Sequence, residues 1–269
     1  MTAYVRRFGR FEVALHGLLM ASFLGLSLTG LPLMFAQRAF AARMAGLVGG
    51  YRATGVLHRF FAVSLLATFA LHVGQVLFRV VRRRELGILW GPGSLVPQPR
   101  DLVDLAGHLR WFAGLGPRPR FGRYTYWEKF DYWAVFWGMG IIGGSGLLLW
   151  FPELFARVLP GWAFNIALLV HGEEALLAVG FIFTIHFFNS HLRPEKFPMD
   201  MVIFTGRVEA GELAHERPLE YARRQADPST DPGPPSHRSW LIGRVIGSTA
   251  VAVGLAIVVM IAYALITEL

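Results

Sequence analysis

Four histidines stand in two pairs of nearly equal spacing, each pair within one apolar stretch of the chain. His58 and His72 are fourteen residues apart, and His171 and His186 are fifteen apart. In an α-helix these separations correspond to roughly −40° and 60° of rotation and to about 21 and 22 Å of rise. Each pair therefore lies on nearly one face of its helix, with one side chain near each end of a membrane span. Imidazole is costly in hydrocarbon unless it is hydrogen-bonded or binds a metal, so the two pairs need a shared explanation.

A fifth histidine, His16, lies in the first apolar stretch. His16, His72 and His186 each lie six or seven residues from a flanking arginine, which indicates one shared depth. His58 and His171 then share the other depth, because the second and fourth stretches run in the same direction. Neutral imidazole is a good axial ligand for haem iron, and a four-helix bundle presents such ligands from facing helices. The economical interpretation is two haems, one near each membrane surface, each held by two histidines.

The composition indicates a polytopic membrane protein. Of 269 residues, 54% are hydrophobic and 16% are charged, and the mean hydropathy of +0.45 is too high for a soluble domain of this size. The 26 Lys and Arg, which give a net charge of +8, lie mostly between apolar stretches and determine topology rather than bind nucleic acid. The chain has no cysteine, which excludes iron–sulfur ligation and covalent haem attachment. Bound haem would therefore be b-type, and two histidines on each iron predict electron transfer rather than oxygen chemistry.

Five apolar runs are long enough to cross a bilayer, and they predict an all-α fold. We expect Lys and Arg to hold the N-terminus, the loop after the second span and the segment after the fourth in the cytoplasm. The fifth span has no histidine and is expected to be an accessory helix that anchors the chain or binds a partner. The expected organisation is a four-helix haem-binding bundle in residues 1–224, with spans at about 11–35, 55–80, 130–151 and 162–190, then a flexible Pro- and Ser-rich linker at 225–240 and a transmembrane helix at 241–269.

Two further segments carry a structural prediction. In DLVDLAGHLRWFAG, Leu102, Leu105, Leu109 and Phe112 recur at helical spacing, which predicts a short amphipathic helix at the cytoplasmic interface. His108 in this polar segment is expected to be solvated. The small residues of GMGIIGGSG in the third span allow the close approach of another helix or of a flat macrocycle.

Long motifs in the first four spans resemble the haem b membrane subunits of formate dehydrogenase, nickel–iron hydrogenase and thiosulfate reductase. They are RFEVALH…SLTGLPL, LHRFFAV…LH, KFDYWAVFWG…GLLLWFP and HGEEALLAVGFIFTIHFFNSHLRPEKFPMDMVIFTGRV, between about Arg7 and Arg224. The subgroup that they resemble most accompanies multihaem c-type cytochromes in bacterial quinone-linked complexes of respiratory chains. The resemblance implies a dihaem cytochrome b of the bacterial cytoplasmic membrane. It would transfer electrons between quinone or quinol and a partner redox protein, either a multihaem cytochrome c or a dehydrogenase or reductase subunit.

The resemblance leaves the ligands of the inner haem open. In the dehydrogenase-type subunits one haem takes the residues that match His16 and His186, and the other takes those that match His58 and His171. In the cytochrome b of quinol–cytochrome c oxidoreductases the second and fourth spans supply all the ligands, which would use His72 and leave His16 spare. His16 and His72 therefore compete for the inner haem.

Other polar groups lie beside the predicted haems. At the outer level, Glu173 or Glu174 could accept a quinol proton and Arg59 could pair with a carboxylate or a haem propionate, whereas a plain salt bridge near the headgroups is the alternative. At the inner level, Asn189 and His191 could hydrogen-bond quinone carbonyls or could cap the end of the helix.

Two functions of other classes also fit the sequence. A transporter or proton pathway lined by His and Glu predicts a colourless protein, and histidines at two matched depths argue against it. An assembly anchor that binds haem only structurally predicts haems that quinol does not reduce. The sequence names neither the partner nor the direction of electron flow.

Overall fold

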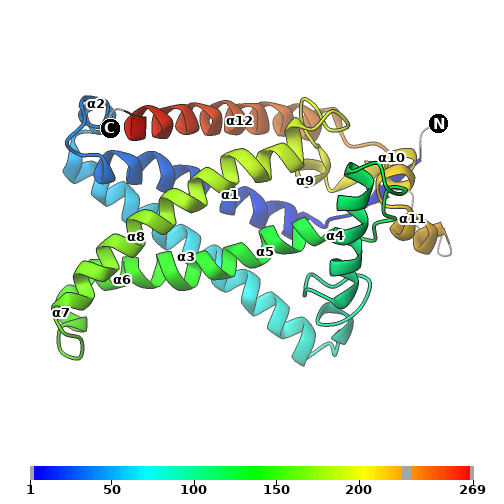
Figure 1. The fold of residues 1–269 in the computed structure, drawn as a ribbon, viewed down its shortest axis with the longest axis horizontal. Helices are drawn as coiled ribbons and strands as arrows, with labels where there is room; N and C mark the ends of the chain where they lie inside the picture. The colour runs from blue at the N-terminus through cyan, green and yellow to red at the C-terminus, as the bar shows by residue number, and fades with distance from the viewer. Residues whose placement is uncertain (1–2, 226–231, 267–269) are drawn as a thin grey trace. The chain divides into compact units, whose positions relative to one another are not determined.

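The computed structural model describes residues 3–225 and 232–266, and these residues are mostly helical (Figure 1). Five helices are long and apolar enough to cross a membrane, which suggests a multi-pass membrane protein. Their bounds lie within about four residues of the five predicted spans, and only the end of the fifth predicted span and part of the predicted linker lie outside the described residues. The five run over Arg10–Met34 (α1), Tyr51–Val81 (α3), Tyr126–Trp150, Trp162–Leu192 and His237–Ile266 (α12).

The third and fourth of these helices are interrupted by π-helical turns. The third consists of α5 (Tyr126–Gly138), the π-helical η2 (Met139–Gly143) and α6 (Gly144–Trp150). In the fourth, α8 (Trp162–Phe181) continues into the π-helical η3 (Ile182–His186) and η4 (Phe188–Leu192). A π turn takes more residues than an α turn, so it changes the direction in which later side chains point.

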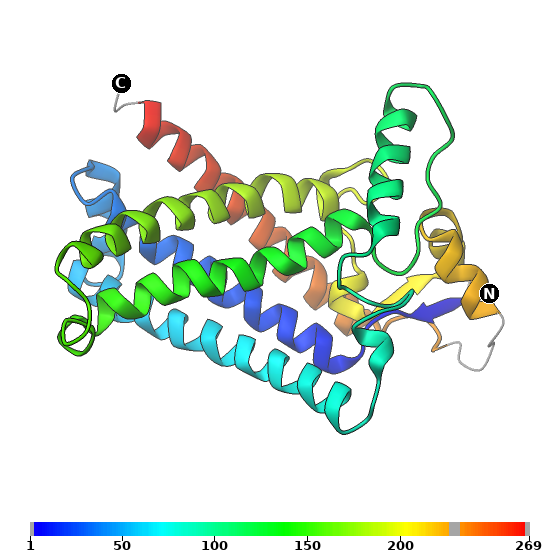
Figure 2. The same cartoon turned by 60° about the horizontal axis from the view of Figure 1, so that its bottom comes forward.

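The described residues form two compact units. The bundle unit comprises Ala14–Ala70, Phe136–Asp200 and the described residues from Leu241 onward, and it holds most of the length of α1, α3, α8 and α12. Figure 2 shows α6 and α8 side by side, joined through the short helix α7 (Pro152–Phe155). Another short helix, α2 (Ala39–Leu47), connects α1 to α3.

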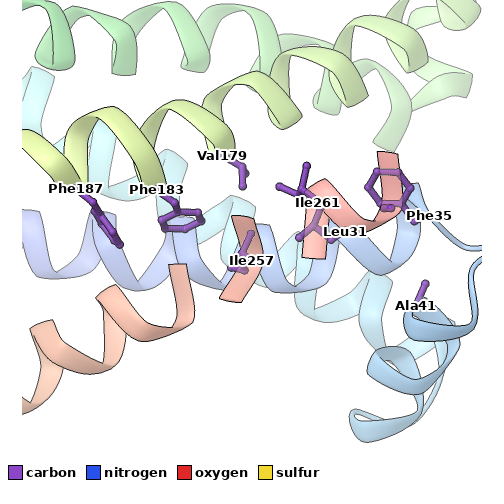
Figure 3. Packing of buried hydrophobic residues seen from close by; sticks show 9 residues of the cluster. Leu31, Phe35, Ala41, Val179, Phe183, Phe187, Ile257 and Ile261 are labelled. Carbon is purple, nitrogen blue, oxygen red and sulfur yellow. The ribbon is translucent and has the colours of Figure 1, made fainter. Parts of the chain in front are cut away.

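Buried apolar side chains of α1, α8 and α12 form the core of the bundle unit. Figure 3 shows Val179, Phe183 and Phe187 of the fourth helix beside Ile257 and Ile261 of α12. The remaining members of this cluster are Leu31, Phe35, Ala41 and Ala264.

The strand unit comprises the described residues up to Val13, Leu71–Val135 and Met201–Trp240. Strand β1 (Tyr4–Arg6) pairs antiparallel with β2 (Arg207–Glu209), and Val208 of β2 lies in a small apolar cluster with Val202 and Leu213. The same unit contains η1 (Leu86–Ile88), α4 (Pro99–Phe112), α9 (Val202–Thr205), α10 (Ala210–Glu216) and α11 (Pro218–Gln225).

Buried ion pairs connect the elements of the strand unit. The Glu220 carboxylate lies 3.3 Å from both Arg7 Nε and Arg123 Nη1. The Lys129 ammonium donates to both carboxylate oxygens of Asp101, at 2.9 and 2.8 Å, and so ties α4 to α5. A buried pair of this kind is costly to break because the remaining charge keeps its desolvation cost.

The predicted amphipathic helix is present as α4, and its apolar face points outward. Leu102 is 71% exposed and Leu109 is 60% exposed, whereas Asp101 lies inside against Lys129. Burial raises the pKa of the Asp104 carboxyl, although Arg100 acts in the opposite direction. This inverted arrangement fits a helix whose apolar side meets lipid.

The prediction that His108 is solvated is wrong. Its ring is buried and stacks on Phe112 at 4.5 Å between centroids, and its Nδ1 lies 3.1 Å from the hydroxyl of Tyr126. Phe121 and Trp127 also contact the ring. The polar composition of the segment did not reveal that Phe121, Tyr126 and Trp127 lie against His108 of α4.

Candidate functional site

The bundle unit brings His58 of α3 and His171 of α8 together. Their ring centroids lie 6.3 Å apart, and the ring planes are nearly perpendicular at 80°. Both side chains are half-buried. These residues are 113 positions apart in the sequence, so the fold, and not local structure, creates the pair.

The hydrogen bonds of His171 fix which of its ring nitrogens carries the proton. Nδ1 lies 3.0 Å from the backbone carbonyl oxygen of Ile142, which can only accept. It also lies 3.3 Å from Ser145 Oγ, whose own hydroxyl donates to the carbonyl of Ile141 at 2.6 Å. The His171 Nδ1–H is therefore the donor, and Nε2 keeps a free lone pair.

The same reasoning applies to His58. Its Nδ1 lies 3.0 Å from Thr29 Oγ1, and the Thr29 hydroxyl donates to the carbonyl of Gly25 at 2.6 Å. The backbone of Leu26 also hydrogen-bonds the ring. With its proton already donated, the Thr29 oxygen accepts from His58 Nδ1–H, so His58 also presents an unprotonated Nε2.

A glycine lies beside each of these two rings. A Cβ atom built on Gly30 of α1 would lie 3.2 Å from His58 Cε1, and one built on Gly146 of α6 would lie 3.0 Å from His171 Cε1. Any larger residue at either position would press on the imidazole. The two rings are therefore supported alike, with an acceptor at Nδ1 and a glycine at Cε1.

The π-helical segment η2 contains the carbonyl that holds His171. Ile142 lies within Met139–Gly143, and both Ser145 and His171 hydrogen-bond its oxygen. In a π turn the regular pairing of helix carbonyls is interrupted, and such turns are frequent at functional sites. The sequence GMGIIGGSG therefore does more than allow close packing. It supplies the Ile142 carbonyl as the acceptor for His171, and its Gly146 leaves space for the His171 ring.

His16 and His186 form the second combination within the bundle unit. His16 lies in α1, His186 in the π-helical η3 and His191 in the π-helical η4. His186 is the last residue of the π-helical η3, so its direction differs from that expected for an unbroken α-helix after His171. Both rings are half-buried.

His72 belongs to the strand unit, where its Nε2 lies 2.9 Å from the hydroxyl of Tyr132. The two rings meet edge to face, with 5.6 Å between centroids. The nitrogen that would bind a metal is thus engaged by a neighbouring side chain.

The ionisable residues predicted beside the outer pair have other neighbours. The Arg59 guanidinium lies over the ring of Trp150, 5.6 Å from its centroid, which is a cation–π arrangement. Trp137 Nε1–H donates to the Glu174 carboxylate at 3.3 Å, and Glu173 is exposed. The ion pairs of the described residues do not join Arg59 to either glutamate.

The polar residues after His186 lie in the π-helical η4. His191 is buried, its Nδ1 accepts from the backbone N–H of Asp200 at 3.3 Å, and its ring contacts Phe187. Asn189 is half-buried in the same turn. The bond to Asp200 ties the segment after the fourth helix back to η4.

Comparison with known proteins found no matching family model and no match among curated proteins. Within residues 3–225 and 232–266, no group of three or more His, Cys, Asp and Glu side chains is arranged to hold a metal ion. Sequence reasoning selected His58 and His171 but missed the residues that orient them, Thr29, Ile142 and Ser145. Gly30 and Gly146 stood in the motifs SLTGLPL and GLLLWFP, although nothing there linked them to histidine rings.

Proposed function

We propose that this chain is a dihaem cytochrome b that carries electrons across a membrane between the quinone pool and a partner redox protein. The observation that carries the proposal is the pair His58 and His171. Both rings donate from Nδ1 to fixed acceptors, which leaves Nε2 unprotonated, and the two ring centroids lie 6.3 Å apart. Imidazoles held in this way are suited to bind a metal ion, because histidines that bind metals are commonly oriented by a hydrogen bond from the other ring nitrogen.

The spacing of the rings fits a metal between them. A transition-metal ion binds an imidazole nitrogen at about 2 Å, so two rings on opposite sides of one ion have centroids roughly 6 Å apart. Two imidazole nitrogens are a donor set that haem iron takes from a protein, so His58 and His171 would hold one haem. The glycines beside both rings leave room for the two imidazoles in these positions.

For the second haem we propose His16 and His186 as ligands. Both belong to the bundle unit, whereas the Nε2 of His72 is engaged by Tyr132. This choice agrees with the ligand scheme of the dehydrogenase-type subunits that the sequence resembles. His72 is then a hydrogen-bonding residue of the strand unit.

Haem held by these histidines would supply one-electron transfer. The residues of the chain hold it and tune it: Thr29 and Ile142 fix the tautomer of the ligands, and the apolar core around Phe183 excludes water. The two histidine levels on the fourth helix are fifteen residues apart, about 22 Å along an α-helix, which spans much of the hydrocarbon thickness of about 30 Å. Electrons can therefore pass from one membrane surface toward the other.

The partner would be a multihaem cytochrome c or a dehydrogenase or reductase subunit, and the membrane would be the bacterial cytoplasmic membrane with the N-terminus inside. The resemblance and the distribution of Lys and Arg support these assignments. Asn189 and Glu174 remain candidates for contacts with quinone, since each lies near one of the proposed ligands in sequence.

A haem count on three chains tests the proposal. The purified wild type should contain two b haems per chain by pyridine haemochrome. His16→Ala should lose one haem, and His72→Ala should keep both because it is not a ligand. A loss in His72→Ala alone would move the second site to His72 and His186, and a wild type without haem would overturn the proposal and favour the transporter.

A further inference from the structure

One face of the fifth membrane helix, α12, packs against the rest of the protein, and its other residues are exposed on the protein surface. Its buried residues alternate at spacings of four and three, which is the pattern of a helix packed along a neighbour by a single seam. Residues between them, such as Val245 and Val259, are exposed. The seam consists of Gly243, Gly247, Ala250, Gly254, Ile257, Ile261 and Ala264.

The seam is tightest at Gly254. A Cβ built on Gly254 would lie 2.5 Å from Phe183 Cδ1 and 2.6 Å from Phe187 Cε2. Real Cβ atoms do not approach carbon this closely, so the two phenyl rings fill the space that the glycine leaves open. Phe183 is 1% exposed and Phe187 is 6% exposed, and thus neither ring can move into free space.

These two phenylalanines flank His186 in the sequence. Phe183 lies inside the π-helical η3, which ends at His186, and Phe187 follows directly. Phe187 in turn contacts the rings of His186 and His191, and Phe183 contacts Phe23 of α1 and Phe187 itself. The stretch that carries His186 is therefore packed between α1 and α12.

A π-helical turn needs such support. It is rare because its hydrogen-bond geometry is less favourable than that of an α-helix, and it persists where the surrounding structure holds it. On the α12 side, this support comes from Gly254 and Ile257. Ile257 is 1% exposed and belongs to the same apolar cluster as the two phenylalanines. Without α12 this side of η3 would face lipid.

We infer that α12 is the element that sets the position of His186, with Gly254 as the positioning residue that acts through Phe183 and Phe187. The inference rests on the proposed function in so far as His186 is a haem ligand. It assigns the fifth helix a role at the second haem rather than a role as an anchor alone.

The test adds one methyl group at two matched glycines. Gly254→Ala places it against the two rings, and Gly180→Ala adds the same group to α8, where nothing lies within 4 Å. In Gly254→Ala we expect the midpoint potential and the low-spin EPR signal of one haem to shift while those of the other haem stay unchanged. Gly180→Ala should have the midpoint potentials and EPR signals of the wild type. A shift in the potentials or signals of both haems in Gly254→Ala would contradict the inference.

A second readout does not depend on haem. Amide hydrogen exchange across Ile182–Leu192 should be several-fold faster in Gly254→Ala than in Gly180→Ala, because the π-helical turns lose their packing.

If Gly254→Ala does not accumulate, Phe183→Leu tests the same contact and should change the same haem. Wild-type exchange and unchanged haems in these variants would overturn the inference and leave the proposed function intact. Absence of haem from the wild type would overturn the proposed function, while the exchange measurement would still decide the role of α12.

Discussion

At the scale of single residues, the histidine pair depends on groups that are not ionisable. The carbonyl of Ile142 and the hydroxyl of Thr29 decide which imidazole nitrogen is free, and two glycines decide where the rings can lie. The sequence predicts His58 and His171 because a histidine is conspicuous in an apolar run. It does not predict their supports, since Thr29 and Gly146 look like ordinary small residues of a membrane helix.

Gly146 offers a direct test of this support. In Gly146→Ala the new methyl group would lie 3.0 Å from His171 Cε1 and should displace the ring, so that one haem binds more weakly, by roughly 10–100-fold as for the loss of an orienting contact. Haem titration of the haem-depleted protein measures the affinity. Gly144→Ala in the same helix, where nothing lies within 4 Å, should bind as the wild type does, and equal losses in the two variants would contradict the account.

At the scale of elements, hydropathy predicts the five spans well and predicts their internal geometry poorly. The third span was expected to begin at Phe130, yet the helix begins at Tyr126, because the buried ion pair of Lys129 with Asp101 allows a charged first turn. The π-helical η2 and η3 are each only five residues long, and their sequences show no hydrophobic periodicity that would distinguish them from an α-helix. Strand β1 is also invisible locally, since Tyr4 pairs with Glu209, more than two hundred residues away.

The ion pair between Lys129 and Asp101 should dominate the docking of α4. Asp101→Ala would leave the buried Lys129 ammonium without its partner and would also remove the acceptor for the Gln98 backbone N–H, so we expect a loss of about 3–5 kcal/mol in unfolding free energy. Denaturant unfolding in detergent measures it. Arg100→Ala breaks a longer pair, at 3.7 Å with Asp104, in which the arginine side chain is exposed, and it should cost about 1 kcal/mol or less. Similar costs in the two variants would show that the buried pair contributes no more than a surface pair.

At the scale of the whole molecule, the distribution of Lys and Arg predicts which loops share a side of the membrane. The segments that contain Arg84 and Arg223 should face the cytoplasm, and those that contain Leu47 and Val158 should face the other side. All four side chains are exposed.

Cysteine labelling can check this topology directly, because the chain has no cysteine of its own. Leu47→Cys and Val158→Cys should react with a membrane-impermeant maleimide in intact spheroplasts. Arg84→Cys and Arg223→Cys should react only after the membrane is opened. The reverse pattern would place the N-terminus outside and exchange the two surfaces assigned to the proposed haems.

The most direct test of the central claim is the visible difference spectrum of the purified wild-type chain after anaerobic addition of a short-chain quinol, with the total set by dithionite. We expect two b haems per chain, with the quinol reducing a substantial part of the dithionite-reducible α-band. A colourless protein would contradict the haem assignment, and haems that dithionite reduces but quinol does not would contradict electron exchange with the quinone pool.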